Sequence, residues 1–199
     1  MSEIEEIREN IKECTLCDLH KERTNTVPGE GPEDAKIALI GEAPGYNEDQ
    51  EGKPFVGDAG DILTELLEKK AGLERKEVFI GNVLKCRPPE NRDPKDKEIE
   101  TCSPYLKKQI RTIEPKLIVS LGRFAANLFS DNSVKISKEH GEIKDIEYGG
   151  WKCKLLLSYH PAAALYGGGV REKLNKDFSK LGEAKDNLND FQTSKQKTL

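Results

Sequence analysis

The sequence lacks any apolar run that approaches the roughly 20 residues needed to cross a bilayer. It also lacks the features of a signal peptide, because the N-terminal segment MSEIEEIRENIKEC is acidic and amphipathic. These two absences argue against a membrane protein and an exported one. We therefore expect a cytoplasmic protein with no membrane partner.

A net positive charge is lacking as well. The chain has 32 lysines and arginines against 36 aspartates and glutamates, which gives a formal net charge of −4. This balance argues only weakly against a nucleic-acid partner, because such binding depends on a local basic patch more than on total charge. One patch of this kind is predicted around Cys86, where five basic residues alternate with acidic ones; a solvated charged loop is the alternative. These five are Lys85, Arg87, Arg92, Lys95 and Lys97.

The composition fits one domain with a sizeable core, since 35% of the 199 residues are hydrophobic and 34% are charged. We expect this domain to span residues 1–183. The polar residues 184–199 are expected to form a disordered tail. We expect the protein to be a monomer.

Strand and helix patterns alternate along the chain. Pro104 predicts a kink or a late start in the helix that contains it, and Gly149-Gly150 is a two-residue hairpin signal. The alternation predicts a doubly wound, parallel sheet. The expected helices span 3–13, 58–72, 95–113, 123–129 and 170–181, and the expected strands span 36–40, 77–80, 116–121, 142–148 and 151–159.

A loop with four glycines, Gly41 to Gly57, leaves the first strand and leads into a helix. Ligands commonly bind at such loops in open α/β sheets, because strand ends and helix N-termini converge there. In a parallel sheet two further loops would share that edge, namely Gly81-Asn82 and the segment from Ser158 to Leu165. A long solvated loop is the alternative for the first of them.

Three side chains in these loops are candidates for binding. Asn82 offers an acceptor and two donors in one plane, which suits a planar ligand with a donor next to an acceptor, such as the N3–H and O4 edge of uracil. Phe55 could stack on a planar ring, and His160 could donate a hydrogen bond to a developing oxyanion. Taken singly, a turn-capping asparagine, a core phenylalanine and a structural histidine are the more common cases. Their expected convergence at one edge favours a binding site.

Four of the five cysteines form two pairs, Cys14 with Cys17 and Cys86 with Cys102. In a chain without an export signal this pattern favours a metal site over disulfides. Zinc and a [4Fe–4S] cluster both accept four cysteines, and the spacing does not separate them. Buried structural thiols are the alternative, and Cys153 is expected to be a core residue.

Three motifs and the cysteine set together resemble the family 4 uracil-DNA glycosylases, which are iron–sulfur enzymes of thermophilic archaea and bacteria. The motifs are GEAPGYNEDQEGKPFVGDAG, GNVLKCRPPENRDP and SYHPAAAL, and the resemblance runs from Cys14 to Leu181. It implies a three-layer α/β/α sandwich with a central, mainly parallel four-stranded sheet. It also implies a [4Fe–4S] cluster, with zinc as the less favoured alternative.

The resemblance further implies a DNA repair enzyme that flips uracil out of single- or double-stranded DNA and hydrolyses its N-glycosidic bond. An abasic site and free uracil would be the products. The implied ligands of the cluster are Cys14, Cys17, Cys86 and Cys102.

The roles of individual residues also follow from the resemblance. Phe55 would stack on the base, Asn82 would read its edge, and His160 would donate to uracil O2. Glu48 would hold the attacking water, and Leu165 would be the wedge that fills the gap left in the DNA. Backbone groups around Glu42 and Ala43 would line the pocket.

Two positions depart from the better-known family 1 glycosylases. Ala43 stands where those enzymes have a water-activating aspartate. Gly45 stands where those enzymes have the residue that blocks the thymine methyl group. Discrimination against thymine must therefore come from elsewhere, with Tyr46 or the pocket wall as candidates.

Three other functions remain open from the sequence. One is an iron–sulfur nucleic-acid-binding module without glycosylase chemistry. The second is an electron-transfer or redox-sensing iron–sulfur protein, and the third is a related glycosylase for other deaminated bases.

Overall fold

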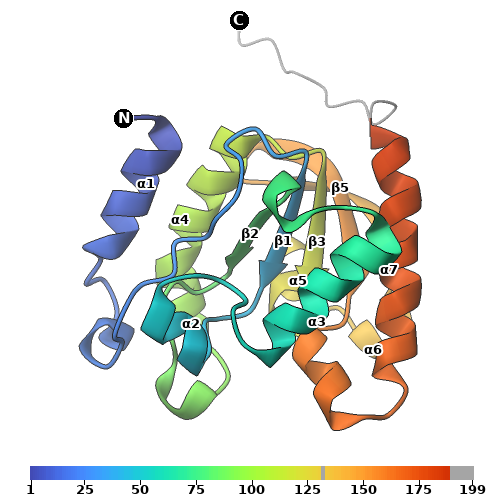
Figure 1. Cartoon of the computed structure of the whole chain (residues 1–199). Coiled ribbons are helices and arrows are strands. Elements are labelled where there is room, and N and C mark those ends of the chain that lie inside the picture. The colour runs from blue at the N-terminus through green and yellow to red at the C-terminus, as the bar shows by residue number, and fades with distance from the viewer. Residues whose placement is uncertain (131–132, 189–199) are drawn as a thin grey trace, which may run out of the picture.

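The computed structural model describes residues 1–130 and 133–188, and it is built around one five-stranded sheet (Figure 1). The strand order is β2-β1-β3-β5-β4, in which the first four strands are parallel and β4 is antiparallel to β5. The strands are β1 (Ile37–Gly41), β2 (Phe79–Asn82), β3 (Leu117–Leu121), β4 (Ile143–Tyr148) and β5 (Trp151–Ser158).

The sheet contains all five strands expected from the sequence patterns, one more than the four-stranded sheet that the resemblance implies. The additional strand is β4, which the Gly149-Gly150 turn folds back onto β5 so that Tyr148 pairs with Trp151. Both glycines have positive φ, 61° and 85°, as a tight two-residue hairpin turn requires. The predicted parallel part of the sheet is therefore confirmed, and the hairpin adds an antiparallel edge.

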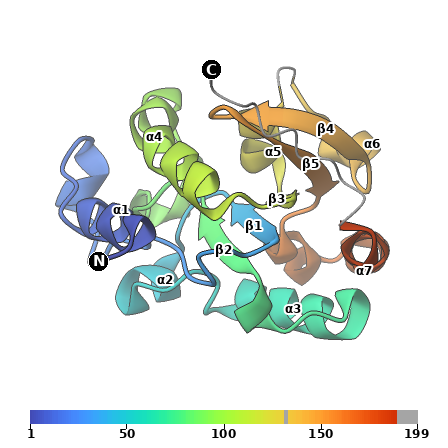
Figure 2. The ribbon, with the colours of Figure 1, turned by 90° about the horizontal axis from the view of Figure 1, so that it is seen from above.

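Helices cover both faces of the sheet, which confirms the predicted α/β/α sandwich (Figure 2). One layer contains α4 and α5, with α1 packed on α4, and the other contains α3 and α7. Within the described residues, no helix is long and apolar enough to cross a membrane. The helices are α1 (Glu3–Lys12), α2 (Tyr46–Glu51), α3 (Asp58–Leu66), α4 (Asp96–Ile113), α5 (Arg123–Phe129), α6 (Ile136–Glu139) and α7 (Val170–Asp186).

Helix α4 continues through Pro104, and its start at Asp96 rules out the predicted late start. A proline has no N–H to donate to the carbonyl of Glu100, four residues earlier. The hydroxyl of Ser103 donates to that carbonyl instead, at 3.3 Å. A neighbouring side chain therefore replaces the missing backbone bond.

Helix α7 passes the domain boundary predicted at residue 183. It runs to Asp186, and both Ala184 and Leu188 are buried in the core. The polar tail therefore begins later than expected, because these two apolar side chains pack against the α3 side of the sheet. Residues 189–199 of the expected tail lie outside the described residues.

The register of the parallel strands brings three chain segments to one edge of the sheet. Gly41 pairs with Asn82, and Leu121 pairs with Ser158. The strands end at the lower edge in Figure 1, where α2 and the start of α3 lie. Strand β2 begins and ends about two residues later than predicted, so Asn82 belongs to the strand. The Gly41–Gly57 loop contains α2, which was not predicted.

We predict that Gly60→Ala lowers the free energy of unfolding by about 1–3 kcal/mol. Gly60 lies in the first turn of α3, and a Cβ there would overlap the backbone carbonyl of Phe55. The loop that carries Phe55 would have to move. Chemical denaturation checks this, with Lys70→Ala, an exposed position nearby, as a control expected to change stability by less than about 0.5 kcal/mol. Equal stabilities would show that the loop does not need this close approach.

Candidate active site

A pocket of about 330 Å³ lies at the carboxyl edge of the sheet. This volume is at the lower end of the range for ligand pockets, about 300–1,000 Å³. Residues from all three predicted strand-end segments line it. Six of the residues predicted from the sequence meet there: Glu42, Ala43, Glu48, Phe55, Asn82 and His160.

Asn82 is the buried polar group of this pocket, with a relative exposure of only 2%. Its Oδ1 atom is buried and has no hydrogen-bond partner. A Cβ on Gly41 would lie 2.5 Å from that oxygen and 2.7 Å from the Phe55 ring. Only glycine at position 41 leaves room for both side chains. The Asn82 Oδ1 atom at the pocket wall is thus unpaired, whereas most buried polar groups in folded proteins have a hydrogen-bond partner.

The rings of Phe55 and His160, which both line the pocket, stack on one another, with centroids 5.5 Å apart and an angle of 26° between their planes. Phe55 has a positive φ of 52°, so its loop needs support. Arg75 supplies it by donating to the carbonyls of Phe55, at 3.0 Å, and Pro54. Glu30 in turn pairs with Arg75 at 2.9 Å. The sequence analysis did not identify Arg75.

His160 has a defined tautomer. The backbone N–H of Ala162 donates to its Nδ1 atom at 3.2 Å, so Nδ1 is an acceptor and the ring hydrogen is on Nε2. Burial lowers the pKa of His160 to about 4, and the negative charge of Glu48 opposes this shift. The imidazole is therefore neutral near pH 7 and can donate one hydrogen bond from Nε2.

Glu48 organises the loop around the pocket. Its carboxylate accepts hydrogen bonds from the backbone N–H groups of Gly45, Val56 and Gly57, at 3.1, 3.0 and 3.3 Å. The adjacent Asp49 is 2% exposed and accepts from the backbone of Thr24 and Asn25, outside the pocket. The two neighbouring carboxylates therefore have separate structural tasks.

Glu42 contributes its side chain to the pocket, whereas only the backbone around it was expected there. Burial and, to a smaller extent, the negative charge of Asp93 raise the pKa of this carboxyl group to about 7. The Arg123 guanidinium acts in the opposite direction. A carboxyl group with a pKa near neutrality can exchange a proton at physiological pH, as a general base does.

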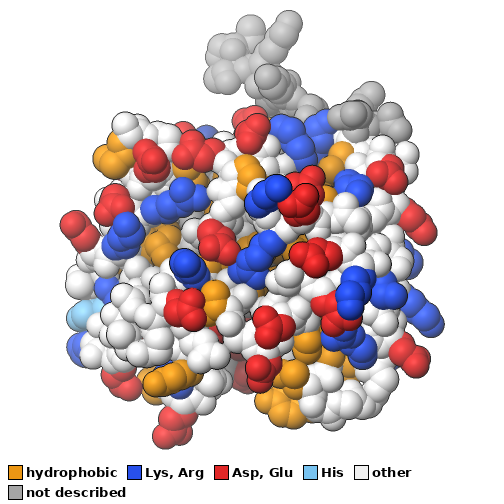
Figure 3. Space-filling view, in the orientation of Figure 1, with side chains coloured by type: hydrophobic (Ala, Val, Ile, Leu, Met, Phe, Trp, Pro, Cys, Tyr) orange, Lys and Arg blue, Asp and Glu red, His pale blue; other side chains and the backbone are white. Residues whose placement is uncertain are grey.

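A 3₁₀ turn, Pro161–Tyr166, follows His160 and ends in two exposed apolar side chains. Leu165 is 48% exposed and Tyr166 is 88% exposed. Tyr166 also lines the pocket, and the sequence analysis missed it. Figure 3 shows charged side chains of both signs across this view, with hydrophobic side chains gathered at the lower edge. The predicted wedge, Leu165, thus lies on the turn beside the pocket mouth.

The four predicted ligand cysteines line one small cavity between α1, α4 and the segment after β2. All four are free thiols, and Cys86 and Cys102 are buried. Arg23 donates to the Cys86 sulfur at 3.1 Å. Within residues 1–130 and 133–188, no three His, Cys, Asp or Glu side chains are spaced to hold a single metal ion. Cys153, in β5, is a core residue as predicted.

The predicted basic patch around Cys86 is smaller than the sequence indicates. Lys85 is 1% exposed and points into the protein. Arg92 forms two hydrogen bonds to Glu98, at 2.9 and 2.6 Å. The Arg87 guanidinium lies 5.2 Å from the centre of the Tyr46 ring. Three of the five basic residues are thus engaged within the fold. Lys85 faces inward because its neighbours Val83, Leu84 and Cys86 are buried.

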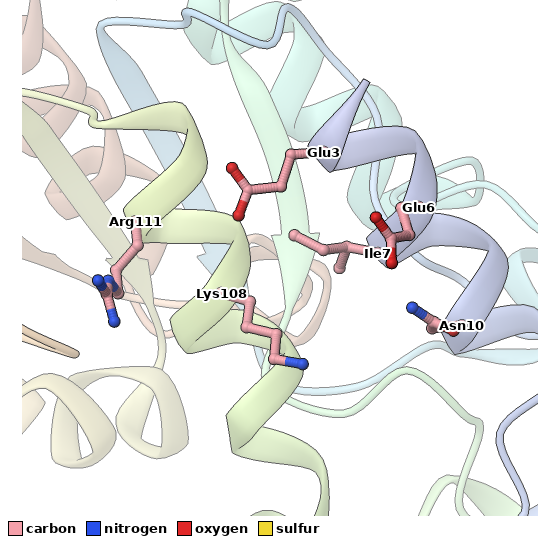
Figure 4. Close-up of a pocket in the computed structure, with 6 residues that line it drawn as sticks. All are labelled: Glu3, Glu6, Ile7, Asn10, Lys108 and Arg111. Carbon is pink, nitrogen blue, oxygen red and sulfur yellow. The ribbon is translucent and has the colours of Figure 1, made fainter. Parts of the chain in front are cut away.

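A second groove, of about 400 Å³, lies between α1 and α4. Figure 4 shows its six lining residues, Glu3, Glu6, Ile7, Asn10, Lys108 and Arg111. The groove contains none of the residues that the sequence predicted for chemistry. The strand-edge pocket is therefore the better candidate for an active site.

Known proteins match the chain over most of its length. The family model of the uracil DNA glycosylase superfamily matches residues 28–181. A type-4 uracil-DNA glycosylase from Archaeoglobus fulgidus is 50% identical, over 92% of this chain and 94% of that protein. Another from Sulfurisphaera tokodaii is 49% identical, over 92% and 85%.

A more distant relative is a type-5 uracil-DNA glycosylase from Pyrobaculum aerophilum, which is 28% identical over 68% of this chain and 65% of that protein. The type-4 proteins thus resemble the chain much more than this type-5 protein does. The family match covers every strand of the sheet and the whole strand-edge pocket. The chain belongs to the uracil DNA glycosylase superfamily.

Proposed function

We propose that the protein is a uracil-DNA glycosylase, which excises uracil from DNA and leaves an abasic site. The relatives that are about half identical over nearly the whole chain carry this name. The structural observation that carries the proposal is the unpaired Oδ1 atom of Asn82. An acceptor buried without a partner is unfavourable by roughly 1–3 kcal/mol, and a ligand N–H would relieve it.

The proposed recognition follows from the donor and acceptor pattern of the base. Uracil presents N3–H next to the O4 acceptor, so the Asn82 amide can accept from the first and donate to the second. Cytosine presents the opposite pattern on that edge. Binding cytosine would leave both polar groups of the Asn82 amide mispaired in a buried site. Phe55 supplies a ring face for stacking at the same wall.

Catalysis requires the base to leave the duplex and the glycosidic bond to break. Flipping the nucleotide costs a few kcal/mol, and the side chain of Leu165 would fill the space that it leaves. Negative charge then develops on the departing uracil. The neutral His160 imidazole donates from Nε2 to uracil O2, where a prepositioned donor stabilises that charge.

Two carboxylates in the pocket are candidates to position the attacking water. Glu48 was predicted for this task, but three backbone N–H groups already occupy most of its acceptor capacity. Glu42 has a pKa close to neutrality and lines the same pocket. We therefore assign the general base to Glu42 and the shaping of the loop to Glu48, which retains one acceptor position for water.

We further propose that the four cysteines hold a [4Fe–4S] cluster. Four thiols that converge on one cavity, with no carboxylate among its lining residues, are the donor set that such a cluster takes. One zinc ion, which would take all four sulfurs at about 2.3 Å, is the less favoured alternative. When bound, the cluster would link α1 to α4 and to the Cys86 segment. The monomeric state and the cytoplasmic location stay predictions.

The function is tested with a labelled oligonucleotide that contains one uracil, followed by hot alkali to cleave at abasic sites. Matched oligonucleotides carry thymine, cytosine or hypoxanthine at that position. Cleavage at uracil alone supports the proposal, and cleavage at hypoxanthine alone would support the related glycosylases. If the cluster-loaded protein binds the DNA but does not cleave it, the result would favour a nucleic-acid-binding module without glycosylase chemistry. Reversible redox cycling of the cluster without DNA binding would favour an electron-transfer protein.

We predict that Asn82→Ala lowers kcat/KM for uracil excision by roughly 10²–10³-fold. The substitution removes both hydrogen bonds to the base edge. Excision rates of the two proteins on the same oligonucleotide measure the effect. Asn10→Ala, which changes an exposed asparagine in the groove of Figure 4, is the control and should leave the rate unchanged.

The excision rate should depend on pH through Glu42. A base must be ionised, and because the pKa of Glu42 is raised to about 7, its ionised fraction is lost as the pH falls through 7. We predict that the single-turnover rate falls about tenfold per unit below about pH 6. His160, with a pKa of about 4, adds no dependence in this range.

Glu42→Gln should be slower than the parent protein at pH 8 and should lose this pH dependence. Glu48→Gln is the matched comparison and should retain the dependence, because Glu42 is still present. If Glu48→Gln instead abolished the pH dependence of the single-turnover rate, Glu48 would be the residue that activates the water.

A further inference from the structure

Lys85 connects the cysteine cavity to the strand-edge pocket. It follows β2 by three residues and directly precedes Cys86. Its ammonium donates a 2.9 Å hydrogen bond to the backbone carbonyl of Asn82, the last residue of β2. Lys85 also lines the cysteine cavity together with Cys102 on α4. One residue therefore contacts a predicted cluster ligand and the residue that reads the base.

The ammonium of Lys85 has a second partner in Gln109 on α4. The Gln109 Oε1 atom accepts from Lys85 at 2.8 Å, and its Nε2 donates to the carbonyl of Pro28 at 2.7 Å. Gln109 is fully buried and Lys85 is 1% exposed. Both acceptors of the ammonium are neutral. A buried charge is stable only when an opposite charge lies nearby, since desolvation of an ion is strongly unfavourable.

The cysteine cavity supplies the missing opposite charge. Lys85 lines this cavity together with the four cysteines. Cys86 follows Lys85 directly in the chain, and the buried side chains of Cys86 and Cys102 line the same cavity as Lys85. A cluster held by four thiolates carries a net negative charge, whereas four neutral thiols carry none.

We propose that Lys85 is a positioning residue that couples the cysteine site to Asn82. The negative cluster balances the buried ammonium, and the ammonium holds the carbonyl of Asn82 so that the side-chain amide stays directed into the pocket. The cluster would therefore support recognition of uracil through a chain of two contacts, without taking part in the reaction. This inference rests on the proposed function and on the proposed cluster.

Lys85→Met tests the coupling in the cluster-loaded protein. Methionine keeps a long apolar side chain but removes the charge and the bond to Asn82. Two readouts are measured. One is the affinity for DNA with a non-cleavable 2′-fluorodeoxyuridine, compared with the affinity for the same DNA with an abasic-site analogue. The other is the reduction potential of the cluster.

The expected result is a loss of about tenfold or more in affinity for the uracil-containing DNA, because a hydrogen bond to a charged group is lost. Affinity for the abasic analogue should be unchanged, since that DNA presents no base to Asn82. The reduction potential should become more negative, because a nearby positive charge stabilises the reduced cluster. Lys108→Met is the matched control, an exposed lysine on α4 shown in Figure 4, and should change neither readout.

The inference is overturned if Lys85→Met retains both the parent affinity ratio and the parent potential. Equal losses for both DNAs would also overturn it, because they would indicate a general structural defect. If Lys85→Met does not accumulate with its cluster, Gln109→Met replaces it, and an unchanged affinity ratio there overturns the inference. Uracil excision by the parent protein is measured alongside, so failure of the proposed function is seen separately.

Discussion

The hydrogen-bonded register between β1 and β2 sets Gly41 directly beside Asn82, and the pocket depends on this pairing. Because Gly41 has no side chain, the Asn82 amide and the Phe55 ring can both approach its backbone. His160 reaches the same place through the pairing of β3 with β5, which ends at Ser158. Three segments far apart in the sequence therefore meet because parallel strands end at a common edge. The loops add side chains to a position that the sheet has already defined.

Three carboxyl groups near the carboxyl edge of the sheet have different surroundings, although they are chemically alike. Glu42, Glu48 and Asp49 lie within eight residues of one another, and burial raises the pKa of the Glu42 carboxyl group to about 7. The other two accept backbone hydrogen bonds, from loop residues 45–57 in one case and from Thr24 and Asn25 in the other. The number of N–H donors that reach each carboxylate therefore distinguishes the proposed base, Glu42, from the two carboxylates that hold loop backbone.

Much of the fold and the pocket follows from local sequence patterns. Apolar runs and the Gly149-Gly150 hairpin signal together predicted every strand. The expected convergence of Phe55, Asn82 and His160 is confirmed by the pocket that they line. The direction of long side chains could not be predicted, because it depends on tertiary packing. Lys85 was placed on a basic surface although it points inward, and the Glu42 carboxylate and Tyr166 were missed. Helix α2 was not predicted, because it is short and has a glycine at each end. The hydrogen bond by which Glu48 caps it can be recognised only in the folded loop.

The cavity that collects the four cysteines has a consequence for the order in which the protein matures. Cys14 and Cys17 leave the ribosome long before Cys86 and Cys102, and the last of these lies on α4, which follows the first two strands. No metal–thiolate group with all four ligands can assemble until more than half of the chain has been synthesised. Until then the two early thiols would have to remain reduced and unpaired in the nascent chain. Insertion of the proposed cluster would thus be a late step of biosynthesis, and it would join the beginning of the protein to its middle.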